Sequence, residues 1–344
     1  MAQKIKILSK KKCQGDIARY LSQFDSHVHS FSHCVSVSRK DVPWDDTETG
    51  LDYRLLFIKN SLSLIYESAK QKGIAVQVVT EHPQFSRYKI PFENYLNAFN
   101  EIKKKYLHHF AALPLGMEIE IKKNNKGVYI DLDEISDGIL DPMDVLKKID
   151  VLVFSMHQKY FKSQAAEIKN SYEFVETVKQ GLEKIVELKE HLRKKRLKEK
   201  ICILGHPWDV AARTNIKTWK KDEEIKAKYP EFEDYLRSND VQISFLSTAE
   251  LREISDALLS SGVYPEINAH SIQENRSDIR KGRFPKNNII QAYLDYCIEK
   301  KKRPIISIGT DDHKITGIGN LQLGTVLKKV KSLDKAVVWC EQLQ

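Results

Sequence analysis

Seven short apolar runs, each followed by a longer amphipathic segment, are the feature that most restricts how this chain can fold. The runs are rich in β-branched residues and predict strands, whereas the segments between them repeat apolar residues at helical spacing. The expected strands are residues 23–28, 75–80, 112–121, 150–155, 201–205, 263–268 and 305–309. The expected helices are residues 53–71, 92–108, 142–148, 172–198, 249–260, 287–300 and a last one after residue 324. This alternation predicts an α/β fold with parallel strands and helices outside.

The domain organisation follows from what interrupts this alternation. No repeat of 20–50 residues and no Pro/Gly/Ser-rich linker divides the chain, so residues 1–344 are expected to form a single domain. The sequence Asn-Asn-Lys-Gly at 124–127 predicts a hairpin turn after the third strand. Residues from about 158 to 200 and from about 210 to 239 are longer than a minimal barrel requires, and predict helical insertions that serve as lids or partner surfaces.

Cysteine usage and hydropathy bear on the compartment. No stretch approaches the roughly 18 apolar residues of a membrane span, and the basic N-terminus lacks the apolar run of a signal peptide. The five cysteines, Cys13, Cys34, Cys202, Cys297 and Cys340, form no CxxC pair, and their odd number argues against a disulfide framework. We therefore expect reduced thiols, a cytoplasmic protein and no membrane partner.

The net charge of +9 allows two interpretations. The first is a Lys-rich solvated surface, and the second is a phosphate-rich partner, either a nucleic acid or a phosphorylated metabolite. Much of the excess lies in residues 189–200, which continue a segment with apolar residues three and four positions apart. This region therefore predicts an amphipathic helix with a basic outer face.

Side chains able to bind metal occur at or near the C-terminal end of nearly every expected strand. They are His27, His29, His82, Glu118, His157, His206, Asp311 and His313. A single histidine is more often a core or surface residue than a ligand, and His108, His109 and His191, in or beside expected helices, are interpreted in that way. Eight such residues at equivalent strand ends favour a shared site, because active sites of parallel barrels lie at that end.

The ligand types indicate the chemistry. Imidazole and carboxylate without thiolate suit zinc, manganese or iron, and Glu118 is the best candidate for a carboxylate that bridges two ions. Such a cluster supplies hydroxide near neutral pH and stabilises the charge of a transferring phosphoryl group. The residues therefore predict a metal-dependent phosphoesterase.

The motifs also resemble a known family. Asp-x-His-x-His, Thr-Glu-His, Gly-x-Glu, Ser-x-His, Gly-His-Pro, Glu-Ile-Asn and Thr-Asp-Asp-His occur in the order found in the polymerase and histidinol phosphatase (PHP) superfamily. The resemblance covers residues from about 24 to 319. It looks closest to the histidinol-phosphatase branch, on account of residues 149–157 and of Glu-Ile-Asn at 266–268 followed by Arg276, Arg283, Phe284 and Pro285.

The resemblance implies a distorted (β/α)7 TIM-like barrel with a site for two to three divalent ions. Carried over by position, His27, His29, Glu118 and Asp311 would bind the first ion. Glu118, His157 and a residue of the loop after His29 would bind the second, and His82, His206 and His313 would complete the cluster.

The same resemblance makes His313 and an arginine near the substrate phosphate candidates for catalysis. Arg276 or Arg283 could be that arginine, although either could equally form a surface salt bridge. The chain departs from the family after His29, where His33 comes earlier than the usual ligand. We expect His33 to bind despite the shorter spacing; Cys34 as its substitute, or a weak metal site, are the alternatives.

Three functions remain open from the sequence. The leading one is a phosphomonoesterase for a small phosphorylated metabolite, with histidinol phosphate as the first candidate. The second is a PHP-type nuclease or phosphodiesterase, which the positive net charge favours mildly. The third is a non-enzymatic binding scaffold, which the complete ligand set argues against. The oligomeric state does not follow from the sequence.

Overall fold

The structure is a computed structural model, and the part of the chain that it describes covers most of the predicted elements. The described residues are 6–9, 11–13, 16–30, 47–83, 90–136, 140–157, 168, 170–206, 219–231, 234–235, 246–269, 289–311, 317–321 and 323–343.

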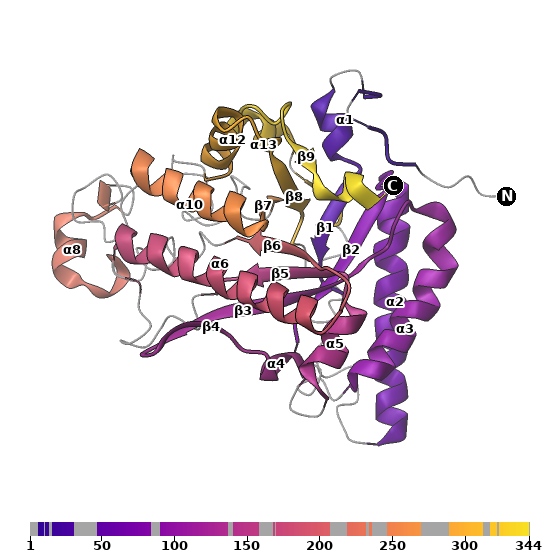
Figure 1. Cartoon of the computed structure of the whole chain (residues 1–344). Coiled ribbons are helices and arrows are strands. Elements are labelled where there is room, and N and C mark those ends of the chain that lie inside the picture. Colours follow the sequence, from indigo (N-terminus) through magenta and orange to yellow (C-terminus); the bar gives the residue numbers. More distant parts are fainter. Residues whose placement is uncertain are drawn as a thin grey trace.

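Eight parallel strands form a nearly closed barrel surrounded by helices (Figure 1). In spatial order they are β1 (Phe24–Val28), β2 (Val76–Glu81), β3 (Leu115–Asn124), β5 (Val151–Ser155), β6 (Ile201–Gly205), β7 (Tyr264–Asn268), β8 (Ile305–Gly309) and β9 (Val337–Val338). β1 also approaches β8, because Ser26 Oγ bonds to Ile308 O and the amide of Asp311 donates to His27 O at 2.7 Å. The predicted α/β TIM-like barrel is therefore confirmed, with the short β9 as an eighth strand beyond the predicted seven.

The register of the central strands brings their C-terminal ends to one level. β3 pairs with β5 from Gly116 opposite Val151 to Glu120 opposite Ser155, and β5 pairs with β6 up to Gly205. β3 continues beyond this level into a hairpin with β4 (Gly127–Ile130), in which Asn124 lies opposite Gly127. The predicted turn after the third strand is thus confirmed, and side chains that follow the strands meet at one end of the barrel.

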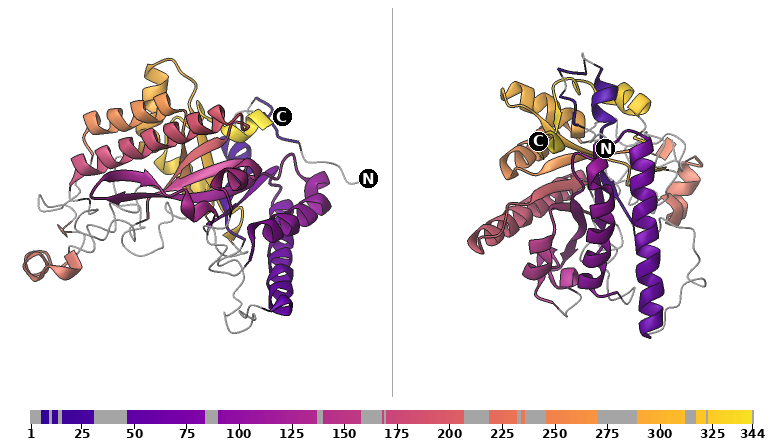
Figure 2. Two further views of the ribbon diagram at one scale, coloured as in Figure 1. Left: turned by 60° about the horizontal axis from the view of Figure 1, so that its bottom comes forward. Right: turned by 90° about the vertical axis from the view of Figure 1, so that its right-hand side faces the viewer.

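Helices cover the outside of the barrel. The main ones are α2 (Glu48–Gln71), α3 (Phe92–Tyr106), α5 (Pro142–Lys148), α6 (Ser171–Lys194), α10 (Thr248–Ser261), α12 (Ile289–Glu299) and α13 (Leu323–Lys329). The shorter ones are α1 (Ile17–Leu21), α4 (Asp133–Ser136), α8 (Glu223–Lys228) and the 3₁₀ turns Leu107–His109 and Trp339–Leu343. α2 lies beside α3, and α6 lies beside α10 (Figures 1 and 2).

The helix predicted at 172–198 ends earlier, at Lys194. Arg196 has φ 56°, and Leu197 and Arg196 donate their amides to Leu192 O and Arg193 O at 3.0 and 2.9 Å. This pair of hydrogen bonds is a Schellman cap, with Arg196 in the left-handed position that glycine usually occupies. The basic residues after Lys194 therefore lie in a connection to β6 and not along the face of a helix.

The core continues from the barrel to the helices. Val151 to Phe154 of β5 are fully buried, as expected of a strand with both faces covered. On the helix side, a Cβ on Gly181 of α6 would lie 3.1 Å from Ile121 Cδ1 of β3. α6 therefore packs directly on the barrel, within the region predicted as the insertion at about 158–200. Of the second predicted insertion, residues 219–231 and 234–235 are described and include α8.

Among the described helices, none combines the length and the apolar character that crossing a membrane requires. Cys13, Cys202, Cys297 and Cys340 are buried free thiols, and Cys34 lies outside the described residues.

Candidate metal centre

Seven of the predicted ligands fall in the described part of the chain, and all seven converge on one cluster. They are His27, His29, His82, Glu118, His157, His206 and Asp311. The other predicted residues of the site, His33, Arg276, Arg283 and His313, lie outside the described residues, as does the alternative ligand Cys34.

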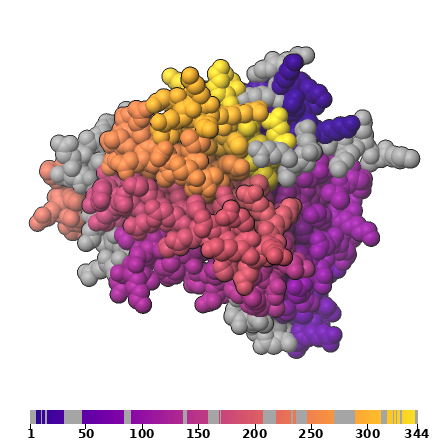
Figure 3. Space-filling view, in the orientation of Figure 1, coloured from indigo at the N-terminus to yellow at the C-terminus, as the bar shows by residue number. Residues whose placement is uncertain are grey.

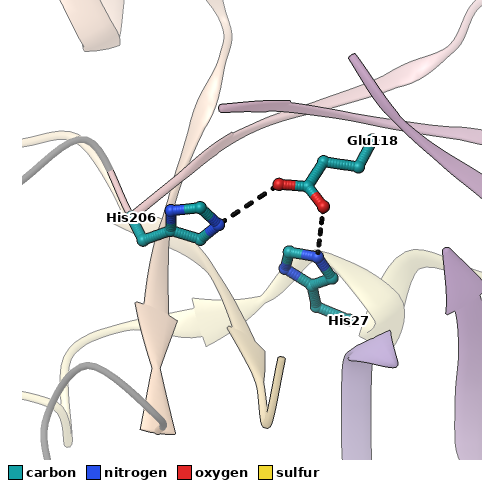
Figure 4. Close-up of side chains that lie close together, drawn as sticks. All are labelled: His27, Glu118 and His206. Atoms are coloured by element: carbon teal, nitrogen blue, oxygen red, sulfur yellow. Dashed lines mark ion pairs between the residues drawn. The ribbon is translucent and has the colours of Figure 1, made fainter. Parts of the chain in front are cut away.

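The carboxylate of Glu118 is the centre of the cluster. Its Oε2 lies 3.5, 3.2 and 3.3 Å from the Nε2 atoms of His27, His29 and His82. Its Oε1 lies 3.2 Å from His206 Nε2 and 3.8 Å from His157 Nε2. Figure 4 shows His27 and His206 approaching the two oxygens from different sides. Each oxygen of Glu118 therefore faces a different group of histidines.

Asp311 brings a second carboxylate to the Nε2 atoms of the same histidines. Its Oδ1 is 3.7 Å from His27 Nε2 and 3.3 Å from His29 Nε2, and its Oδ2 is 3.7 Å from His206 Nε2. Three sets of side chains each bring their ligand atoms within 4.8 Å of one another. The sets are His27–Glu118–His206, His27–His29–Asp311 and His29–His82–Glu118.

The spacing of these atoms fits metal ligands better than hydrogen bonds. Charge-assisted hydrogen bonds between nitrogen and oxygen measure about 2.7–2.9 Å. Two ligand atoms on one tetrahedral ion with bonds of about 2.0–2.1 Å lie about 3.3 Å apart. The distances from Glu118 to His29, His82 and His206 are 3.2–3.3 Å. His27 Nε2 is buried and forms no hydrogen bond with any described residue, which a bound cation would explain.

Buried polar side chains form hydrogen bonds that orient three of these ligands. His27 Nδ1 bonds to Glu266 Oε1 at 3.0 Å, and His157 Nδ1 lies 2.8 Å from both oxygens of Glu120. Asn268 Nδ2 donates to Asp311 Oδ2 at 3.0 Å and to Glu266 Oε2 at 3.2 Å. Carboxylates of this kind fix the imidazole so that Nε2 faces the ion, and they raise its basicity.

These supporting residues were missed as site residues by sequence reasoning. A signal for them was present, because Glu118 and Glu120, like Glu266 and Asn268, are two positions apart on a strand and so point to the same face. Polar residues on the inner face of an otherwise apolar strand could have been assigned to the site on that ground.

Two further buried carboxylates fix the loops that carry ligands. Asp25 accepts hydrogen bonds from the amide and hydroxyl of Thr310, at 3.0 and 2.9 Å, and from the amide of Gly319 at 2.9 Å. Glu81 accepts one from the amide of Ser30 at 2.8 Å. The chain directly after His29 and directly before Asp311 is therefore anchored to the barrel.

Electrostatics within the cluster are strong. Burial would raise the pKa of Glu118, but His82 and the other histidines around the carboxylate outweigh it and hold this pKa well below its usual range. Burial lowers the pKa of His82 to about 4. For His29, burial also acts downward, yet Asp311 and Glu118 raise the pKa to about 9. The ionised carboxylates thus create a negative centre suited to cations.

The backbone is unusual at two ligands and at the strands that carry them. His206 and Asp311 have φ 21° and 48°, in the left-handed region that costs a residue with a side chain about 1–3 kcal/mol. A Cβ on Gly309 would lie 2.6 Å from His27 Cβ, and one on Gly205 would lie 2.8 Å from Val153 Cγ1. The ligand-bearing strands approach so closely that only glycine fits there.

The ligands of the cluster differ in how far they are exposed. The side chains of His27, His29, His206 and Glu118 are at most 3% exposed. Those of His82, His157 and Asp311 are 18%, 24% and 13% exposed, so a ligand can approach past these three.

No model of a known protein family matches this chain, and a search of curated proteins finds no match either.

Proposed function

We propose that this chain is a metal-dependent phosphoesterase of the PHP kind, and that it hydrolyses a small phosphomonoester such as histidinol phosphate. The observation that carries this proposal is the convergence of five imidazoles on the single carboxylate of Glu118 at the C-terminal ends of parallel strands. A site of histidines and carboxylates without thiolate suits manganese, zinc or iron.

Two or three such ions would lower the pKa of water to near neutrality and offset the charge of a phosphoryl group. Under the proposal, the residues of the chain bind and orient. His27, His29, Glu118 and Asp311 would hold one ion, and Glu118 and His157 would contribute ligands to a second. Glu266, Asn268 and Glu120 keep these ligands aimed at the centre.

Under the proposal the substrate would approach past His82, His157 and Asp311, whose side chains are the more exposed ones of the cluster. His313 follows Asp311 by two positions, and we retain it as the candidate for proton transfer. Arg276 and Arg283 remain the candidates for binding the terminal phosphate, which a guanidinium recognises through two parallel hydrogen bonds.

The test combines metal analysis with a comparison of substrates. The purified protein should contain about two to three divalent ions per chain, and chelation should abolish hydrolysis. Histidinol phosphate, an aryl phosphate and single-stranded DNA are assayed side by side with manganese. Turnover of the monoesters supports the proposal, cleavage of DNA alone supports the nuclease, and no turnover with metal restored contradicts both.

Two variants connect the activity to the cluster. Glu118→Gln and His157→Ala should each lower turnover by at least about 100-fold while the circular dichroism spectrum stays unchanged. Glu187→Gln removes an equal charge from a side chain that is 63% exposed on α6, and should leave turnover unchanged. Turnover like that of the unmodified protein in Glu118→Gln would remove the cluster from the reaction.

A further inference from the structure

The connections from helices to strands all lie at one end of the barrel, opposite the metal centre, because the strands are parallel. In Figure 1 the connection from α6 to β6 turns at this end. We take each connection between two successive strands of the barrel, from the last four residues of its final α-helix to the residue before the next strand, and call the surface that these connections form the basic face. These segments are residues 68–75, 103–114, 145–150, 191–200, 258–263, 296–304 and 326–336.

The positive charge of the protein is concentrated in these seven segments. They contain 21 Lys or Arg and only four acidic residues, Asp150, Glu199, Glu299 and Asp334. The whole chain has 56 Lys or Arg and 47 Asp or Glu, so the remainder has 35 and 43 and is net negative. The net charge of +9 is therefore a property of one face and not of the surface in general.

The helix dipole does not account for a surplus of this size. The C-terminus of a helix carries about half a negative charge, which favours basic residues there. Seven helix ends amount to about −3.5 in total. The basic face exceeds its four acidic residues by 17 Lys or Arg, about five times what the dipoles would neutralise.

Two helix caps keep a basic residue where glycine would be more stable. Arg196 after α6 and Lys301 after α12 have φ 56° and 54°. In each cap the next residue donates its amide back to the helix, Leu197 to Leu192 O and Lys302 to Cys297 O. Glycine is the usual residue at this left-handed position, since a Cβ is strained there. A residue that departs from such a local conformational preference is typically found where function requires its side chain.

Some of the basic residues serve the fold and are not available to a partner. Lys200 is buried, and its Nζ donates to Ile149 O at 2.5 Å and to Lys147 O at 3.3 Å, at the C-terminal end of α5. Lys198 Nζ lies 3.7 Å from Asp150 Oδ1, so the connection after α6 lies beside the connection after α5. Other basic residues of these segments are exposed, among them Lys104, Lys148, Lys194 and Lys195, and Figure 3 shows the segment near residue 200 at the surface of the protein.

We propose that the basic face binds a nucleic acid through its phosphate backbone, at a site separate from the metal centre. A surface rich in Lys and Arg on one side of a domain is the electrostatic footprint of such binding. A membrane is the less suitable partner, because stable attachment of a basic surface needs a second, apolar anchor. Of the exposed large hydrophobic side chains in the described chain, only Leu107 and Ile298 lie on this face, and they are on different helices.

The first experiment measures binding of a fluorescein-labelled 20-nucleotide poly(dT) strand to the full chain by fluorescence anisotropy. The variant Lys104→Gln, Lys148→Gln, Lys194→Gln, Lys195→Gln removes four exposed charges from three helix ends. Its Kd at 150 mM salt should rise at least about tenfold, and the slope of log K against log salt should become shallower by about three.

A matched control removes the same net charge elsewhere. The variant Lys126→Gln, Lys184→Gln, Lys220→Gln, Lys221→Gln changes the β3–β4 hairpin, the middle of α6 and the segment before α8. Its Kd should stay within about twofold of the unmodified protein. Equal losses in the two variants would mean that net charge alone governs binding, and would overturn the proposal.

A second pair of variants separates binding from stability. Arg196→Gly should raise the unfolding temperature by about 2 °C, because it relieves the left-handed residue, and should still weaken DNA binding. Glu187→Gln on α6 should change neither quantity. Tight binding to phosphatidylserine vesicles, with no binding to DNA at 150 mM salt, would overturn the proposal in favour of a membrane surface.

Discussion

Glu266→Gln is the perturbation that best tests how the metal centre is held together. The Glu266 side chain is fully buried, with Oε1 3.0 Å from His27 Nδ1 and Oε2 3.2 Å from Asn268 Nδ2. Both nitrogens donate, so both need an acceptor. Glutamine has nearly the same shape but accepts on one oxygen only. In either orientation of the amide, therefore, His27 or Asn268 loses its acceptor, and the remaining hydrogen bond is no longer charge-assisted.

The expected loss follows from these bonds. A hydrogen bond to a charged group contributes about 1.5–3 kcal/mol. Because about 1.4 kcal/mol corresponds to a factor of ten, the affinity for zinc or manganese should fall about 10- to 100-fold, the range typical of residues that hold metal ligands from behind. The affinity is measured by competition with a chromophoric chelator at pH 7.5.

Two other variants make the outcome specific. In Glu120→Gln one oxygen can still accept from His157 Nδ1, so the loss should be smaller than in Glu266→Gln. In Glu253→Gln the lost partner is Lys179 on the surface, so affinity should change less than about twofold. The reasoning would be refuted by a Glu266→Gln variant that binds metal as tightly as Glu253→Gln does.

Three further outcomes are expected. Asp25→Asn should lower the free energy of unfolding in urea by about 1–3 kcal/mol, because an amide cannot accept from both the hydroxyl and the backbone around Thr310; an unchanged midpoint would contradict this. The pKa of His29 is raised to about 9, so binding of an ion at pH 7 must displace a proton, and apparent metal affinity should increase from pH 6 to about pH 9; a flat profile in chelator competition would exclude it. Gly181→Val should destabilise by about 1–3 kcal/mol in the same urea assay, since its side chain would collide with Ile121, whereas a substitution accepted without loss would mean that α6 can shift.

The bounds of strands that end in glycine were predicted most accurately from the sequence. The strands ending at Gly205 and Gly309 have the predicted bounds, because a buried apolar run and its terminator coincide there. The third strand was predicted from residue 112 but begins at Leu115, after Pro114, which has no amide to donate. The eighth strand, β9, has two residues and carries no periodic signal of its own.

The metal centre was predictable to the extent that it depends on strand order. Parallel strands bring their ends together, so His27, Glu118 and His206 could be assigned to one site before any coordinates were known. The hydrogen bond between His27 and Glu266 could not be inferred, because it depends on which side chains face each other across the barrel. The left-handed backbone at His206 was likewise not predictable, since no local sequence rule favours histidine there.

Gly116, Gly205 and Gly309 have a consequence for how this sequence can vary. None of them carries a metal-binding group, yet an added methyl on each would come within 2.9 Å of a neighbouring atom: Thr80 Oγ1, Val153 Cγ1 and His27 Cβ, respectively. A library of all single substitutions, selected for hydrolysis, should therefore reject alanine at these three positions as strictly as it rejects changes of the histidines. Rejection of substitutions at these glycines would then reflect how closely neighbouring strands of the barrel approach each other. Residues that take no part in the reaction would tolerate as few substitutions as the metal ligands do.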